Sequence, residues 1–182
     1  MSIEGYRRQL DAIESDARDL LTRVTDAQLN TQPNPASWSI GQCFDHLIVS
    51  GRAELPFLDR AIREGHEKKL FGQEPFHYGF LGNWSVRLMD APARMKFKAP
   101  KVYRPLASRY TVEVLTTDFF SLHDDWRKCL NASERLHLSS IRVSTPVTRF
   151  ITFSLGQAFA LGLAHERRHM WQARRIRESL PG

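Results

Sequence analysis

Apolar residues recur at alternating spacings of three and four along four stretches of the chain, which is the pattern of amphipathic α-helices. These stretches cover residues from about 3 to 25, 39 to 62, 108 or 111 to 130, and 154 to 178. The second stretch carries two adjacent apolar stripes, so we expect that helix to pack against more than one neighbour. The pattern predicts an all-α protein in which residues 1–182 form a single four-helix-bundle domain.

Two of the predicted helices have clear start signals. Ser39 is followed three residues later by Gln42, and Ser154 is followed at the same distance by Gln157. This is the spacing of the capping box, which satisfies the first backbone N–H groups of a helix. Pro56 lies inside the second stretch, where it predicts either a kink or a stop at the preceding residue followed by a restart.

Two longer segments connect the predicted helices. Residues 66–106 contain several glycines and prolines that break the helical pattern, and we expect a short helix around 83–90. Lys98-Ala99-Pro100 and Arg104-Pro105 then favour an extended connection. Residues 131–153 have the character of a loop, with a short extended piece at 141–143. We therefore expect a long connection between the second and third helices.

Composition adds the class of protein to this picture. The chain has 182 residues, of which 42% are hydrophobic and 25% charged, as in an ordinary soluble globular domain. No apolar run is long enough to cross a membrane, and no signal-peptide pattern is expected at the start. Two cysteines make no disulfide framework, so we expect a cytoplasmic protein without a membrane partner.

The net charge of +6 is concentrated in one segment. Residues 66–110 contain nine Lys or Arg and three Asp or Glu, and basic and acidic residues balance elsewhere. Aromatic residues between the basic ones allow two interpretations, nucleic-acid binding or a solvated connection anchored to the core by its aromatic side chains. We favour the solvated connection, because no nucleic-acid motif accompanies the charge.

Near the C-terminus, residues 165–169 read His-Glu-Arg-Arg-His, which matches the H-E-x-x-H pattern of zinc peptidases. Residues four apart lie on one face of a helix, so His165 and His169 can converge on one metal ion. A zinc peptidase needs a third ligand further along the chain, where Glu178 is the sole acidic residue. Peptidase activity is therefore a distant alternative.

His46 is the candidate third ligand. It lies on the second apolar stripe of the second helix, where a histidine is more often a hydrogen-bonded core residue than a ligand. With His165 and His169 it makes three histidines from two helices, and facing helices of a bundle can hold a metal. Three protein ligands with an open position are typical of a catalytic site. Imidazoles suit Zn, Ni, Fe or Cu, and we expect Zn or Ni, with Fe or Mn as alternatives.

Three further residues are candidates for supporting roles. Glu166 can act as a catalytic base or pair with an arginine. Gln172 can orient a histidine or a bound water, although an interhelical hydrogen bond is the simpler role. Cys43 can support the metal as a soft ligand, but a small buried thiol is the more common situation. The other histidines are expected at the surface, namely His66, His77, His123 and His137.

Several motifs together resemble the DinB superfamily. The second helix begins Trp38-Ser39-Ile40-Gly41-Gln42 and continues with Asp45-His46-Leu47. The fourth begins Ser154-Leu155-Gly156-Gln157-Ala158 and continues with His165-Glu166-Arg167-Arg168-His169-Met170-Trp171-Gln172. Lys98-Ala99-Pro100 and Tyr103-Arg104-Pro105 are similar to the connection before the third helix in one DinB-like subgroup. The resemblance covers nearly the whole chain in the right order.

This resemblance implies an up-down-down-up four-helix bundle, often dimeric, with a divalent metal held by His46, His165 and His169. It also implies a metal-dependent enzyme that activates a low-molecular-weight thiol or a water for transfer to, or hydrolysis of, a small-molecule substrate. The alternative is a bundle that binds a metal, a ligand or a partner protein without catalysis. Nucleic acid is not an expected partner, and the residues that bind substrate are not predicted.

Overall fold

The computed structural model describes residues 2–76, 80–92, 98–107, 109–148 and 151–180. The chain is mostly helical, with one two-stranded sheet. In order, the elements are α1 (Ile3–Leu21), α2 (Asp26–Asn30), α3 (Ile40–Glu67), α4 (Phe80–Met89), the 3-10 turn η1 (Lys101–Tyr103), α5 (Val112–Ala132), β1 (Arg142–Ser144), β2 (Thr152–Ser154) and α6 (Leu155–Ser179).

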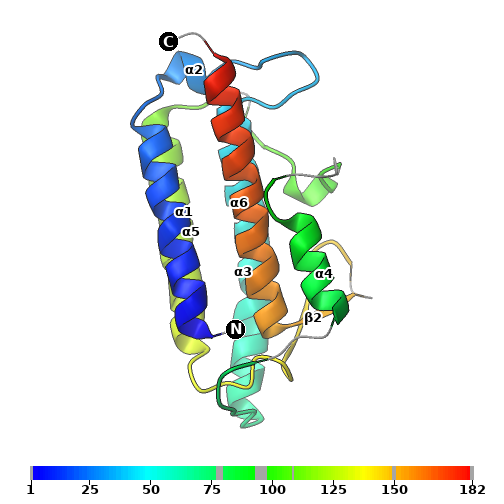
Figure 1. Cartoon of the computed structure of the whole chain (residues 1–182). Helices are drawn as coiled ribbons and strands as arrows, with labels where there is room; N and C mark the ends of the chain where they lie inside the picture. Colours follow the sequence, from blue (N-terminus) through cyan, green and yellow to red (C-terminus); the bar gives the residue numbers. More distant parts are fainter. Residues whose placement is uncertain (1, 77–79, 93–97, 108, 149–150, 181–182) are drawn as a thin grey trace.

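The four long helices lie side by side, as Figure 1 shows, and enclose the main apolar core. Both α1 and α3 pack against α5 and α6, whereas α4 packs on the outside of α6. Large aromatic side chains fill the centre: Phe44 meets Phe119 edge to face at 5.1 Å between ring centroids, and Trp126 meets Phe159 at 6.1 Å. The apolar stripes of the sequence therefore face one another.

The starts of α3 and α6 are confirmed at the predicted residues. Ser39 accepts a hydrogen bond from the backbone N–H of Gln42, and the Gln42 side chain accepts one from the backbone N–H of Ser39. Ser154 and Gln157 form the same reciprocal pair at the start of α6. These caps set the rotation of the two helices from their first turns.

The first helix is shorter than the predicted range of about 3 to 25, and a separate short helix, α2 (Asp26–Asn30), follows it. α1 ends at Leu21, and a third capping box, formed by Thr25 and Gln28, starts α2. A cap residue has extended backbone, so the chain cannot remain helical through Thr25. Val24 is nevertheless buried, which explains why the apolar pattern continues past the end of α1.

The alternative of a stop at Pro56 is wrong, because α3 continues through this residue to Glu67. Proline has no N–H and leaves the carbonyl of Arg52, one turn earlier, without its helical hydrogen bond. Both Pro56 and Arg52 are exposed, so water can satisfy that carbonyl. Because α3 is one uninterrupted helix, it carries residues of the candidate site over several turns.

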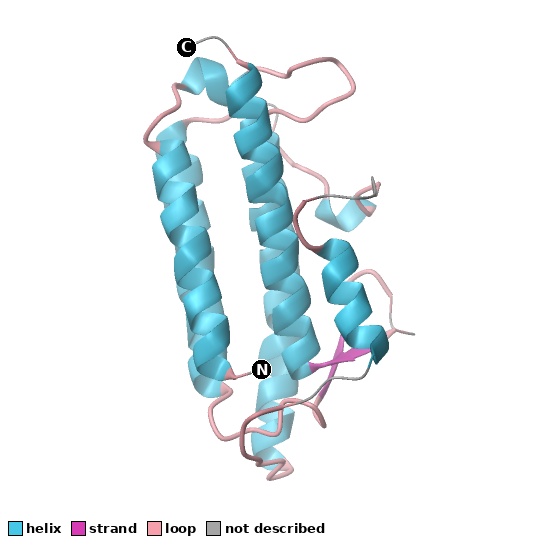
Figure 2. Ribbon diagram, viewed as in Figure 1, coloured by secondary structure: helices cyan, strands magenta, loops and turns pink. Residues whose placement is uncertain are grey.

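The connections contain more regular structure than the sequence predicts. The short helix expected around 83–90 is α4, which begins at Phe80. The extended piece expected at 141–143 is β1, and its antiparallel partner β2, which leads directly into α6, was not predicted (Figure 2). A 3-10 turn, η1, interrupts the expected extended connection.

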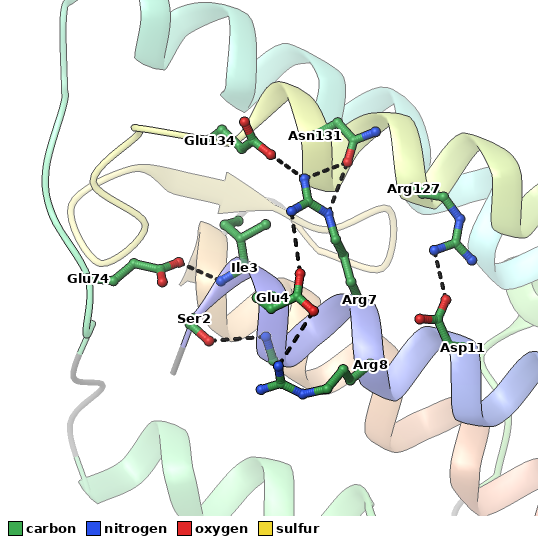
Figure 3. A network of polar contacts seen from close by, with 11 residues as sticks. Ser2, Ile3, Glu4, Arg7, Arg8, Asp11, Glu74, Arg127, Asn131 and Glu134 are labelled. Carbon is green, nitrogen blue, oxygen red and sulfur yellow. Dashed lines mark hydrogen bonds and ion pairs between the residues drawn. The ribbon is translucent and has the colours of Figure 1, made fainter.

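Polar contacts fasten the N-terminal end of α1 to the end of α5 (Figure 3). The guanidinium of Arg7 donates to the side chains of Asn131 and Glu134. The backbone N–H of Ile3 donates to Glu74, which brings the start of the long connection onto α1. In the part of the chain that the structure describes, no helix is both long and apolar enough to cross a membrane.

Candidate metal centre

Three predicted ligands come together between α3 and α6. α3 supplies His46, and α6 supplies His165 and His169 from successive turns of one face. One ring nitrogen from each lies within 4.8 Å of the others, and the Nε2 atoms of His46 and His165 are 2.9 Å apart. Such a group can hold a metal ion.

The chain itself orients the ring of His46. Its Nδ1 lies 2.5 Å from the carbonyl oxygen of Tyr103 in η1. A carbonyl can only accept, so Nδ1 carries the proton and Nε2 presents a lone pair toward the other two histidines. Hydrogen bonding of the non-ligating nitrogen to a carbonyl is the usual support of a metal-binding histidine.

Burial keeps all three imidazoles neutral, which is the form that binds a metal. Desolvation, aided by neighbouring positive groups, lowers the pKa of His165 to about 3 and that of His169 to about 2. Desolvation also lowers the pKa of His46, against the opposing effects of the Tyr103 carbonyl and Asp45. Three neutral nitrogen donors with no carboxylate among them fit a divalent ion of the kind that imidazole prefers.

Gln172 and Trp38 surround the ring of His169. The Trp38 indole stacks on it at 5.6 Å between centroids. Gln172 interacts with the ring and opposes the lowering of its pKa, although the buried Nδ1 of His169 has no hydrogen bond of normal geometry in the described structure. Gln172 is thus close to the His169 ring.

A cavity of about 1310 Å³ opens beside the histidines. His165 and His169 line one side of it, α4 contributes Trp84 and Leu88, and the β1–β2 hairpin contributes Phe153. The cavity is large enough for a small organic molecule, since ligand pockets commonly measure about 300–1,000 Å³. A molecule bound there would reach two of the three candidate ligands.

Glu54 also lines this cavity, and the sequence analysis missed it. The hydroxyl of Tyr103 donates to its carboxylate at 3.0 Å. Desolvation raises the pKa of Glu54 to about 7, with a further contribution from Glu166 and an opposing one from the Tyr103 hydrogen bond. The sequence signal that could have found it is its position about two helical turns after His46 on α3.

Glu166 does not line the cavity but lies in the interior with His123. Its carboxylate is 3.0 Å from Nε2 of His123, whose Nδ1 is 3.5 Å from Glu14 of α1. Burial lowers the pKa of His123, but the two carboxylates outweigh it and raise the pKa to about 9. Glu166 therefore pairs with a histidine rather than with an arginine.

The expectation that His123 lies at the surface is wrong, because its side chain is fully buried. It follows Phe119 by four residues and precedes Trp126 by three, so it lies on the apolar face of α5. This spacing could have revealed its burial. His66 is exposed as expected, His137 is half-buried, and His77 lies outside the described residues.

Cys43 is part of the apolar core and not of the ligand group. Burial raises the pKa of its thiol, which favours the neutral, unreactive form. The interpretation as a small buried thiol accounts for its position, three residues before His46 on α3.

Comparison with known proteins yields one match. The family model of the DinB superfamily matches residues 9–173, which is most of the chain. No curated protein and no solved structure matches this chain.

Proposed function

This chain belongs to the DinB superfamily, and on that basis we propose that it is a metal-dependent enzyme. His46, His165 and His169 would hold one divalent ion, with Zn or Ni preferred over Fe or Mn. The reaction would transfer a thiol to a small electrophilic substrate or, as the second choice, hydrolyse it. The observation that supports catalysis is the cavity that reaches His165 and His169.

An open cavity separates this proposal from its main alternative, a bundle that binds a metal or ligand without catalysis. A purely structural centre is enclosed by protein ligands and side chains, whereas a catalytic centre needs a free position and access for substrate. Trp126 packs on Phe159 in the core and does not cover the histidines. Trp38 stacks on His169 yet itself lines the cavity.

Each neighbouring side chain has a role in this proposal. A bound divalent ion would lower the pKa of a thiol or water at its open position. Tyr103 keeps Nε2 of His46 unprotonated through its carbonyl. Glu54, with its pKa near neutrality, can exchange a proton with a substrate in the cavity. We assign the acid–base role to Glu54 rather than to Glu166, because the Glu166 carboxylate already forms an ion pair with His123.

The distant alternative, a zinc peptidase, has little support. Its third ligand would have to follow His169, but Glu178 does not join the ligand group. Its catalytic base would be Glu166, which is buried beside His123 instead of lining the cavity. Among the described residues, the histidines therefore have neither a downstream third ligand nor a glutamate of the motif that faces the cavity.

We further infer that the long helices form an up-down-down-up bundle and that the protein is a homodimer, as in the family. The mutual packing of α1 and α3 on α5 and α6 supports the bundle. So does the long connection of residues 68–111 between α3 and α5. Sedimentation of the purified protein tests the dimer.

Metal analysis tests the first step of the proposed function. Tag-free protein should contain about one metal per chain, and His46→Ala and His169→Ala should lose it. His66→Ala is the matched control, because this histidine is exposed and outside the group. Equal metal content in all four proteins would contradict the proposed metal site.

Turnover is then tested with a panel of thiols and a chromogenic electrophile in the presence of Zn, Ni or Mn. Absence of turnover in every combination would leave the non-catalytic bundle.

A further inference from the structure

Described residues of the basic aromatic segment, residues 66–110, form part of the outer wall of the cavity. Trp84 and Leu88 of α4 line it, as do Lys98 and Arg104 from the connection that follows. α4 packs against α6, which places this wall on the same helix that carries His165 and His169. Lys98 and Arg104, two of the nine basic residues of this segment, therefore line the same cavity as His165 and His169.

The charges that line the cavity are mainly positive. Lys98, Arg104 and Arg168 contribute cations, and Glu54 is the one acid among the described residues that line it. No carboxylate in the described ranges forms an ion pair with Lys98 or Arg104. Such a surface attracts anions, because cations outnumber acids in its lining.

Large apolar side chains of the same cavity remain in contact with water. Trp84 is 55% exposed, Ile151 is 54% exposed and Trp171 is 37% exposed. A protein rarely leaves several such side chains around one hollow unless a ligand or partner covers them. Two indoles offer flat faces to an aromatic or otherwise apolar body.

We propose that this cavity binds a small organic anion with a flat apolar body and a carboxylate. The apolar body lies against Trp84 and Trp171, and the carboxylate lies near Lys98 and Arg104. This inference deepens the proposed function by naming a substrate class. It rests on the proposed function only in the statement that the bound anion is a substrate. Charge complementarity favours this occupant over a neutral molecule or a second copy of the chain.

Three probes with the same ring and different charge test the proposal: naphthalene-2-carboxylate, naphthalene-2-carboxamide and naphthalen-2-ylmethylammonium. Binding is measured by calorimetry and by quenching of tryptophan fluorescence, in chelator, so that no metal takes part. The carboxylate should bind about tenfold more tightly than the amide, and the ammonium ion more weakly than either. Leu161→Trp, which narrows the cavity, should weaken all three.

Two charge reversals locate the binding site of the anion. Arg104→Glu should remove most of the preference for carboxylate over amide while leaving amide binding within about twofold. Arg63→Glu carries the same change of charge on an exposed residue of α3 that does not line the cavity, so it should keep the preference.

Several results would overturn the proposal. One is equal binding of the three probes by the wild-type protein. Another is carboxylate binding that occurs only after Zn is added, since the metal and not the cationic wall would then hold the anion. A third is a wild-type protein that binds none of the probes. Selective carboxylate binding by a protein that fails to bind metal would support this inference while the proposed function fails.

Discussion

The carbonyl oxygen of Tyr103 lies 2.5 Å from Nδ1 of His46, and this contact fixes which nitrogen of His46 faces the other two histidines. The hydroxyl of the same tyrosine donates to Glu54 at 3.0 Å. One residue of η1 therefore links the candidate metal centre to the acidic group of the cavity, through its backbone on one side and its side chain on the other.

Replacement of Tyr103 by Phe separates these two contacts. The backbone carbonyl that orients His46 remains, so metal content should not change. The hydrogen bond to Glu54 lowers its pKa, so its loss should raise that pKa further above about 7. Stability should fall by about 1 kcal/mol, the usual net value of one hydrogen bond. Carboxyl NMR titration and urea denaturation measure the two effects. A lower pKa of Glu54 in the variant would contradict the assignment.

Replacement of Glu54 by Gln should remove one pH-dependent contribution to stability. The carboxyl has a pKa of about 7 in the folded protein and 4.5 as its ordinary value, so the folded state holds the proton more tightly. The contribution of Glu54 to wild-type stability should therefore fall as pH rises from about 4.5 to about 7, and this loss persists above that range. Glu54→Gln should lack the decrease. Urea midpoints across this range, measured in chelator, provide the comparison, with Glu67→Gln as an exposed control on the same helix.

The same Glu54→Gln variant should retain metal and lose catalysis if the proposed acid–base role is right. A positioned acid or base contributes typically about 10²–10⁴-fold to a rate. The pH–rate profile of the wild-type protein should show a step near 7 that the variant lacks. An unchanged profile in Glu54→Gln would assign proton transfer to another group.

Replacement of His123 and Glu166 by leucine, singly and together, should show that the charge of His123 stabilises the buried carboxylate of Glu166. His123→Leu leaves the Glu166 carboxylate buried without its charge partner, which should cost about 3–5 kcal/mol. The double variant His123→Leu/Glu166→Leu should recover much of this loss. The pKa of His123 is raised from its ordinary value of 6.5 to about 9. The contribution of the pair to folding stability should therefore be fully present below pH 6.5 and be lost as pH rises through about 9. Strictly additive single and double variants would rule out the pairing.

Gly162 is a close-approach position on α6. A Cβ atom there would lie 2.1 Å from the indole ring of Trp126, which is fully buried and cannot retreat. Gly162→Ala should therefore destabilise the protein by about 1–3 kcal/mol through overpacking. Gly5→Ala is the matched control, since its Cβ would meet only the Ser2 hydroxyl at 3.1 Å. A thermal melt of Gly162→Ala as stable as the control would contradict the packing.

The sequence predicted the parts of the fold that depend on near neighbours in the chain. The spacing of apolar residues located the long helices, and the pairs Ser39–Gln42 and Ser154–Gln157 located the starts of α3 and α6. Thr25 and Gln28 carry the same signal, and it could have divided α1 from α2. The candidate ligands were identified from a spacing of four on α6 and from the family resemblance of the residues around His46.

By itself the sequence determined which long helices form, where two of them begin and which three histidines are candidates for one site. The tertiary structure decided that Glu54 and Tyr103 belong beside that site, that His123 holds Glu166 in the interior, and that the basic aromatic segment lines a cavity. The physical reason is the range of the interactions. Helix periodicity and capping act over three or four residues, whereas contacts across the fold depend on the rotation and register of helices that lie far apart in the chain.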